Sequence, residues 1–126
     1  MEANRILIVE DEGIQAMGLE ETLLDAGYEV VAIADNGVEA LDYVKRGLVD
    51  LILMDIHIKG DMDGIDTALN VRSIMPGMPI IYLSAYMDNE TVRRAEATEP
   101  TAYITKPYRQ AQLLNTIQTA LEKKEP

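Results

Sequence analysis

Short apolar runs alternate along the chain with longer segments in which apolar residues return every three or four positions. The runs occupy residues 6–9, 30–34, 51–54, 80–83 and 101–105, a length typical of strands buried in a parallel sheet. The segments between them have the period of helices. This alternation predicts an α/β fold, a doubly wound parallel sheet of five strands with helices on both faces.

Each predicted helix has an apolar stripe that we expect to face the sheet. The stripes are Ala16, Leu19, Leu23 and Ala26; Val38, Leu41 and Val44; Ile65, Ala68, Leu69 and Ile74; and Leu114, Ile117 and Leu121. Asn36 and Glu39 are spaced as in an N-terminal capping box, and Asp88 is placed to cap the fourth helix. Pro107 is expected in the first turn of the last helix.

Length and composition narrow the class of protein. The 126 residues suit a single domain over 1–126, and 48% hydrophobic residues are enough to build a core. The absence of cysteine excludes disulfides and thiolate sites, and a net charge of −11 argues against direct nucleic-acid binding. No signal peptide and no apolar run of about 20 residues are present, so we expect a cytoplasmic protein without a membrane anchor.

Polar residues stand directly after four of the predicted strands. Glu10 and Asp11 follow the first strand, Asp55 the third, Ser84 the fourth and Lys106 the fifth. The carboxyl ends of parallel strands share one edge of the sheet, so these side chains should converge there. Crowded carboxylates repel one another unless a cation neutralises them, and ligands made only of oxygen favour Mg²⁺, or Mn²⁺.

The remaining residues at this edge suit phosphoryl chemistry. Lys106 adds a fixed positive charge and Ser84 adds a hydroxyl donor. Together with a metal ion, these groups can hold the three oxygens of a phosphoryl group while Asp55 acts as the nucleophile. The sequence therefore predicts a phosphoaspartate site.

Four blocks of sequence resemble the receiver domains of two-component response regulators. They are residues 6–12 (ILIVEDE), 51–55 (LILMD), 83–85 (LSA) and 103–107 (YITKP), in that family's order and spacing. The resemblance covers essentially the whole chain and implies a flavodoxin-like strand order of 2-1-3-4-5. It further implies a stand-alone signalling switch rather than an enzyme. The switch would be a monomer or a weak homodimer. A sensor histidine kinase or histidine phosphotransfer protein would phosphorylate it, and it would control a downstream protein partner.

The resemblance also implies a role for each acidic residue. Asp55 would be the phosphoacceptor, Asp11 would bind Mg²⁺ directly, and Glu10 would act largely through water. The backbone carbonyl of His57 would complete the protein ligands of the metal.

Three further residues complete the resemblance. Lys106 would pair with Asp55 or its phosphoryl oxygens, and Ser84 would donate a hydrogen bond to one of those oxygens. Tyr103 would be the switch aromatic that moves inward with Ser84, which repacks the face made by the fourth helix, fifth strand and last helix. The peptide between Lys106 and Pro107 would be cis.

The chain departs from the family at several positions. Glu10 stands where Asp is usual, and the loop at residues 55–64 is one residue longer than the common form. Residues 100–102 (PTA) replace an acidic pair found in receivers that dimerise, which leaves dimerisation open. His57 and Tyr86 flank the expected approach of water and are candidates for tuning hydrolysis.

Other functions fit the sequence less well. A Mg²⁺-dependent phosphatase that passes through aspartyl phosphate needs a carboxylate two residues after Asp55, where His57 stands, and usually a cap domain. A flavin-binding domain needs a phosphate-binding loop after the first strand, but residues 10–12 are acidic. Residues 61–64 (DMDG) resemble part of a calcium loop, but Lys59 and Asn70 would stand at its first and last positions, where acidic ligands are required.

Overall fold

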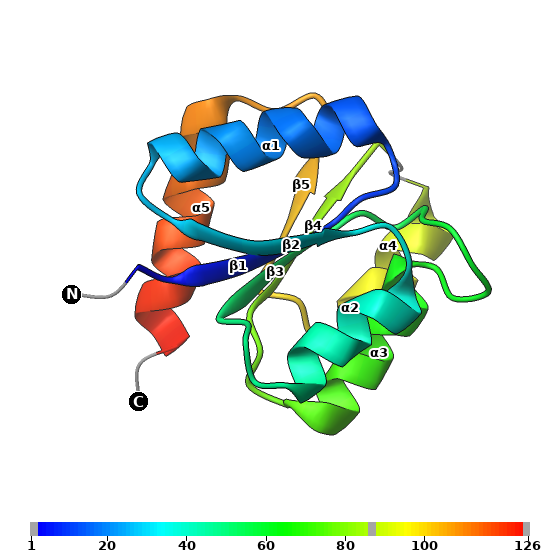
Figure 1. Cartoon of the computed structure of the whole chain (residues 1–126). Coiled ribbons are helices and arrows are strands. Elements are labelled where there is room, and N and C mark those ends of the chain that lie inside the picture. Colours follow the sequence, from blue (N-terminus) through cyan, green and yellow to red (C-terminus); the bar gives the residue numbers. More distant parts are fainter. Residues whose placement is uncertain (1–2, 86–87, 125–126) are drawn as a thin grey trace.

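A computed structural model describes residues 3–85 and 88–124 and shows a parallel sheet between two layers of helices (Figure 1). The strands are β1 (Arg5–Val9), β2 (Glu29–Ala34), β3 (Leu51–Met54), β4 (Ile80–Ser84) and β5 (Ala102–Thr105). The helices are α1 (Gly13–Asp25), α2 (Gly37–Lys45), α3 (Gly64–Ile74), α4 (Asn89–Glu96) and α5 (Gln110–Lys124). The sheet order is β2-β1-β3-β4-β5, which confirms the predicted fold class and strand order.

The two faces of the sheet bury two separate cores. Helices α1 and α5 cover one face, and α2, α3 and α4 cover the other (Figure 1). Within β1, Leu7 and Val9 belong to the core beneath α2, α3 and α4, whereas Ile6 and Ile8 belong to the core beneath α1 and α5. Because successive side chains of a strand point to opposite faces, a central strand covered on both faces needs a continuous apolar run.

The helix caps follow the sequence with one exception. The Asp88 carboxylate accepts a hydrogen bond from the Thr91 backbone N–H at 3.0 Å, which confirms the predicted cap of α4. The Asn36 side chain likewise accepts from the Glu39 backbone N–H at 2.9 Å. The Glu39 carboxylate, however, accepts from the backbone N–H of Asp35, so the second half of the predicted capping box is wrong.

Three residues assigned to apolar stripes do not face the sheet. Val38 and Leu69 are 72% and 50% exposed, and Ala26 is an exposed residue just after α1. Val38 precedes the buried Ala40 by two residues, and Leu69 precedes the buried Val71 by two. Two residues correspond to about 200° around a helix of 3.6 residues per turn, which places Val38 and Leu69 on the outer faces.

The last helix starts later than the sequence suggested. The Lys106 backbone N–H donates to the Ser84 carbonyl at 2.8 Å, so the chain still follows the edge of the sheet there, and α5 begins only at Gln110. Pro107 therefore lies before the helix, and the peptide that joins it to Lys106 is cis, as the resemblance implied. The fully buried residues of α5 are Leu113, Ile117 and Ala120, whereas Leu114 and Leu121 are only half-buried. Within the described ranges, no helix has the length and apolar character needed to cross a bilayer.

Candidate functional site

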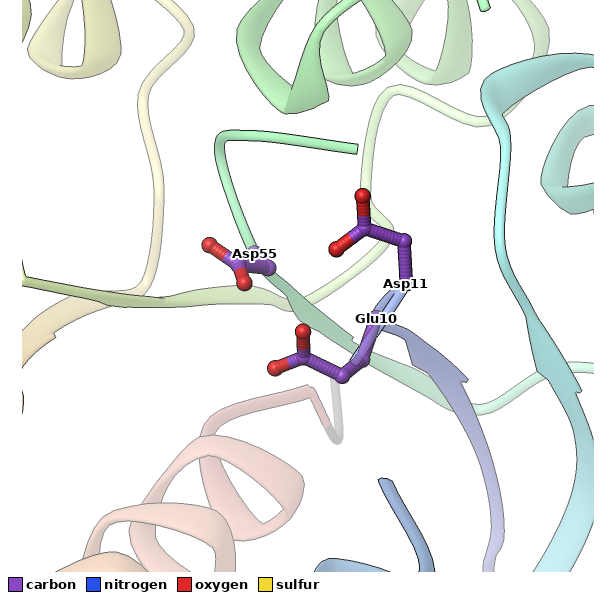
Figure 2. A group of neighbouring side chains, drawn as sticks. All are labelled: Glu10, Asp11 and Asp55. Atoms are coloured by element: carbon purple, nitrogen blue, oxygen red, sulfur yellow. The ribbon is translucent and has the colours of Figure 1, made fainter. Parts of the chain in front are cut away.

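Three carboxylates meet where β1 and β3 end. These neighbouring strands pair Val9 with Met54, and the Asp55 backbone N–H donates to the Val9 carbonyl at 2.9 Å. This register brings Asp55 beside Glu10 and Asp11, and one oxygen from each of the three carboxylates lies within 4.8 Å of the other two (Figure 2). The predicted convergence of these residues is confirmed.

The two strands on the other side of β3 place a positive charge and a hydroxyl at the same edge. The Lys106 Nζ lies 3.0 Å from the Glu10 Oε1 and 3.3 Å from the Asp55 Oδ2. Ser84 is fully buried at the end of β4, where its carbonyl accepts from the Lys106 backbone N–H. Lys106 therefore joins the acidic cluster directly, whereas Ser84 is fixed to the same edge through the backbone.

Burial and charge perturb two groups of this cluster. Burial raises the pKa of Glu10, and Asp55 raises it further, against the opposing effects of the Glu12 backbone N–H and of Lys106. Burial would lower the pKa of Lys106, but its hydrogen bonds and charge interactions with Glu10 and Asp55 outweigh this effect and raise the pKa. The net effect at Glu10 is a raised pKa, which the Glu12 backbone N–H and Lys106 reduce but do not cancel.

The donor set of the cluster suits a small divalent cation. All the side-chain ligands are carboxylate oxygens, which Mg²⁺ prefers. Three carboxylates against one ammonium leave two negative charges uncompensated, and a divalent ion would match that charge. Glu10, Asp11 and Asp55 therefore fit a Mg²⁺ site.

Mg²⁺ is expected to stabilise the folded protein through this cluster. At a concentration one hundredfold above the dissociation constant, the free energy of unfolding should rise by about 2.7 kcal/mol. In Asp11→Asn this increase should be largely lost, because one ligand charge is removed. The measurement is thermal unfolding by circular dichroism in Mg²⁺ and in EDTA.

The exposed Asp61 provides a matched control for this experiment. Asp61→Asn removes the same charge from the nearby loop and should keep the full response to Mg²⁺. An unfolding midpoint of the unmodified chain that does not depend on Mg²⁺ would contradict the assignment of the cluster as a metal site.

Residues 6–118 match the family described as the response regulator receiver domain. This match covers most of the chain and includes every element that contributes to the acidic cluster. The chain belongs to the response regulator receiver domain family. Receiver domains as a class bind Mg²⁺, take phosphoryl groups from histidine kinases and control downstream partners, as signalling switches rather than enzymes.

Known proteins are similar to this chain along nearly its full length. The transcriptional regulatory protein PdtaR of Mycobacterium tuberculosis is 35% identical over 119 residues, which are 94% of this chain and 57% of PdtaR. The chemotaxis protein CheY of Bacillus subtilis is 34% identical over 119 residues, which are 94% of this chain and 98% of CheY. A CheY-like receiver domain protein from Methanospirillum hungatei has a solved structure with a TM-score of 0.91, 30% identity and 98% coverage of both chains.

Three further candidate residues of the receiver remain, namely His57, Tyr103 and Tyr86. His57 is exposed, as expected for a loop side chain. Tyr103 is half-buried, with its ring centroid 5.9 Å from that of Tyr82. Tyr86, the other candidate for tuning hydrolysis, lies outside the described residues.

The loop after Asp55 is fastened to the segment after β2. Lys59 forms an isolated parallel bridge with Asn36, and its backbone N–H donates to the Asp35 carbonyl at 3.1 Å. The Lys59 ammonium lies 3.4 Å from the Asp35 carboxylate, an exposed ion pair. These contacts hold the loop after Asp55 beside the segment between β2 and α2.

Two polar contacts in this receiver had no signal in the sequence. The Gln15 side chain accepts a hydrogen bond from the Lys106 Nζ at 2.7 Å, although a glutamine in the first turn of a helix is unremarkable. The buried Tyr82 hydroxyl lies 2.7 Å from the Thr98 hydroxyl. Burial is the main cause that raises the pKa of Tyr82 to about 12. Tyr82 lies within the apolar run of β4, so the sequence did not predict this polar contact.

Proposed function

We propose that this receiver is a switch in which Asp55 accepts a phosphoryl group. The donor would be phosphohistidine on a sensor histidine kinase or a histidine phosphotransfer protein. The observation that carries the proposal is the position of the Asp55 carboxylate, next to two other carboxylates and within 3.3 Å of the Lys106 ammonium. The surroundings of Asp55 combine a cation site with a fixed positive charge. Transfer of a phosphoryl group to an oxygen nucleophile needs both.

The proposed transfer assigns a task to each residue. Glu10, Asp11, Asp55 and the His57 backbone carbonyl would hold Mg²⁺ or Mn²⁺, which would neutralise charge on the phosphoryl oxygens. An Asp55 oxygen attacks phosphorus, the P–N bond to the donor imidazole breaks, and its electron pair leaves with the imidazole. The Lys106 ammonium donates a hydrogen bond to a phosphoryl oxygen.

The proposed switch begins with the new charge at Asp55. The Ser84 hydroxyl donates a hydrogen bond to another phosphoryl oxygen, and Ser84 moves inward with Lys106. Tyr103 lies on β5, which pairs with the β4 strand that ends at Ser84, and it then follows into the gap. The surface of α4, β5 and α5 repacks and changes the affinity for a downstream protein.

The rest of the proposal concerns how this receiver works as a unit. We infer that residues 1–126 act as one receiver domain, as a monomer or weak homodimer, and not as an enzyme. The net charge of −11 favours output through contact with a protein over direct contact with nucleic acid.

A small phosphodonor tests the proposal without knowledge of the kinase. The chain is incubated with acetyl phosphate and Mg²⁺, and intact mass spectrometry should find the addition of a single phosphoryl group. The addition should be absent in Asp55→Asn and in EDTA, but present in Asp61→Asn. Equal modification of the unmodified chain and Asp55→Asn would overturn the proposal.

A further inference from the structure

The Lys106 ammonium has three hydrogen-bond acceptors, and the nearest is not a carboxylate. Its Nζ lies 2.7 Å from the Gln15 Oε1, 3.0 Å from the Glu10 Oε1 and 3.3 Å from the Asp55 Oδ2. A lysine ammonium has three N–H donors and accepts no hydrogen bond, so the Gln15 amide must face it with oxygen. These three acceptors match the three donors of Lys106.

We propose that Gln15 is a positioning residue for phosphoryl transfer, which acts by holding the Lys106 ammonium beside Asp55. This inference rests on the proposed function. Gln15 is the third residue of α1, and α1 begins two residues after Asp11. The segment that supplies two carboxylates of the cluster therefore also supplies this contact.

A neutral acceptor has a physical advantage at this position. Lysine has a long and flexible side chain, so each additional partner restricts where its charge can lie. Without Gln15, only carboxylate partners would remain, and Glu10 is nearer to the ammonium than Asp55 is. The ammonium would then move toward Glu10 and away from the oxygen that receives the phosphoryl group.

Cation binding would make this contact more important. A Glu10 carboxylate that helps to hold a cation has less negative charge to offer Lys106. The Gln15 amide lies outside the cluster of three carboxylates and keeps its oxygen for the ammonium. Gln15 therefore holds Lys106 in place when the site is ready to react.

The test compares rates of phosphorylation by acetyl phosphate at saturating Mg²⁺ in the full chain. Gln15→Leu should lower the rate about three- to tenfold, the factor that corresponds to one net hydrogen bond. Gln112→Leu is the matched control, because Gln112 is also exposed on a helix, and it should leave the rate unchanged. Calorimetric titration should give both variants the Mg²⁺ dissociation constant of the unmodified chain.

A second comparison distinguishes positioning from a general effect on structure. In a Lys106→Met background, Gln15→Leu should cause no further loss of rate, because the group through which it acts is absent. A rate for Gln15→Leu equal to that of the unmodified chain, or an equal fractional loss with and without Lys106, would overturn this inference. If the unmodified chain itself gains no phosphoryl group, the proposed function fails instead.

Discussion

Gly64→Ala is expected to lower the free energy of unfolding by more than about 3 kcal/mol. A Cβ at Gly64 would collide with the Asp55 carbonyl oxygen and lie 2.8 Å from the Ile56 Cα. These neighbours are backbone atoms, and the Gly64 N–H also donates to the Ile56 carbonyl at 2.6 Å, so the loop has no flexible side chain that could move aside. Urea denaturation followed by circular dichroism measures the effect.

A second glycine provides a control of opposite sign. Gly18 lies inside α1, and a Cβ there would meet no atom within 4 Å. Gly18→Ala should therefore raise the free energy of unfolding by up to about 1 kcal/mol, because alanine is the better helix former. Similar stabilities for Gly64→Ala and the unmodified chain would show that the loop after Asp55 is not packed as described.

Arg72→Leu is the second change for which we expect a large effect, a loss of about 3 kcal/mol in the free energy of unfolding. The Arg72 guanidinium donates to the backbone carbonyls of Met78, Thr98 and Glu99 at 2.6, 2.9 and 2.9 Å. It thereby joins α3 to the segment that precedes β4 and to the segment that follows α4. Leucine would fill part of the space but leave the three carbonyls without this donor.

The control for this change is an arginine that lacks such contacts. Arg93 is exposed on α4, and its guanidinium donates to the Asn89 carbonyl of the same helix at 3.4 Å. Arg93→Leu should change the free energy of unfolding by less than about 0.5 kcal/mol. Equal losses for the two variants in urea denaturation would contradict the role given to Arg72.

The fold and the acidic cluster were predictable because each depends on a simple regularity. Central strands such as β1 and β3 are buried on both faces, so their residues form apolar runs. Parallel strands end at one edge, and this brings Asp11, Asp55 and Lys106 together although they are far apart in sequence. No atomic detail was needed for either conclusion.

The features that the sequence did not reveal depend on how a helix is rotated about its axis and on which partners a long side chain reaches. Val38 belongs to an apolar pattern, but the exact rotation of a short helix decided that it faces solvent. Gln15 and Tyr82 form hydrogen bonds with residues distant in the chain, and nothing in their neighbouring residues marks these partners. A long side chain such as that of Arg72 can reach many carbonyls, so its three acceptors emerge only from the three-dimensional packing.

The most direct measurement locates the phosphoryl group on the chain. After incubation with acetyl phosphate and Mg²⁺, borohydride reduces an aspartyl phosphate to homoserine, and peptide mass spectrometry finds the position. The account predicts homoserine at position 55 and at no other aspartate. Homoserine at Asp11 or at a surface aspartate instead, or no reducible phosphate while Mg²⁺ is bound, would contradict it.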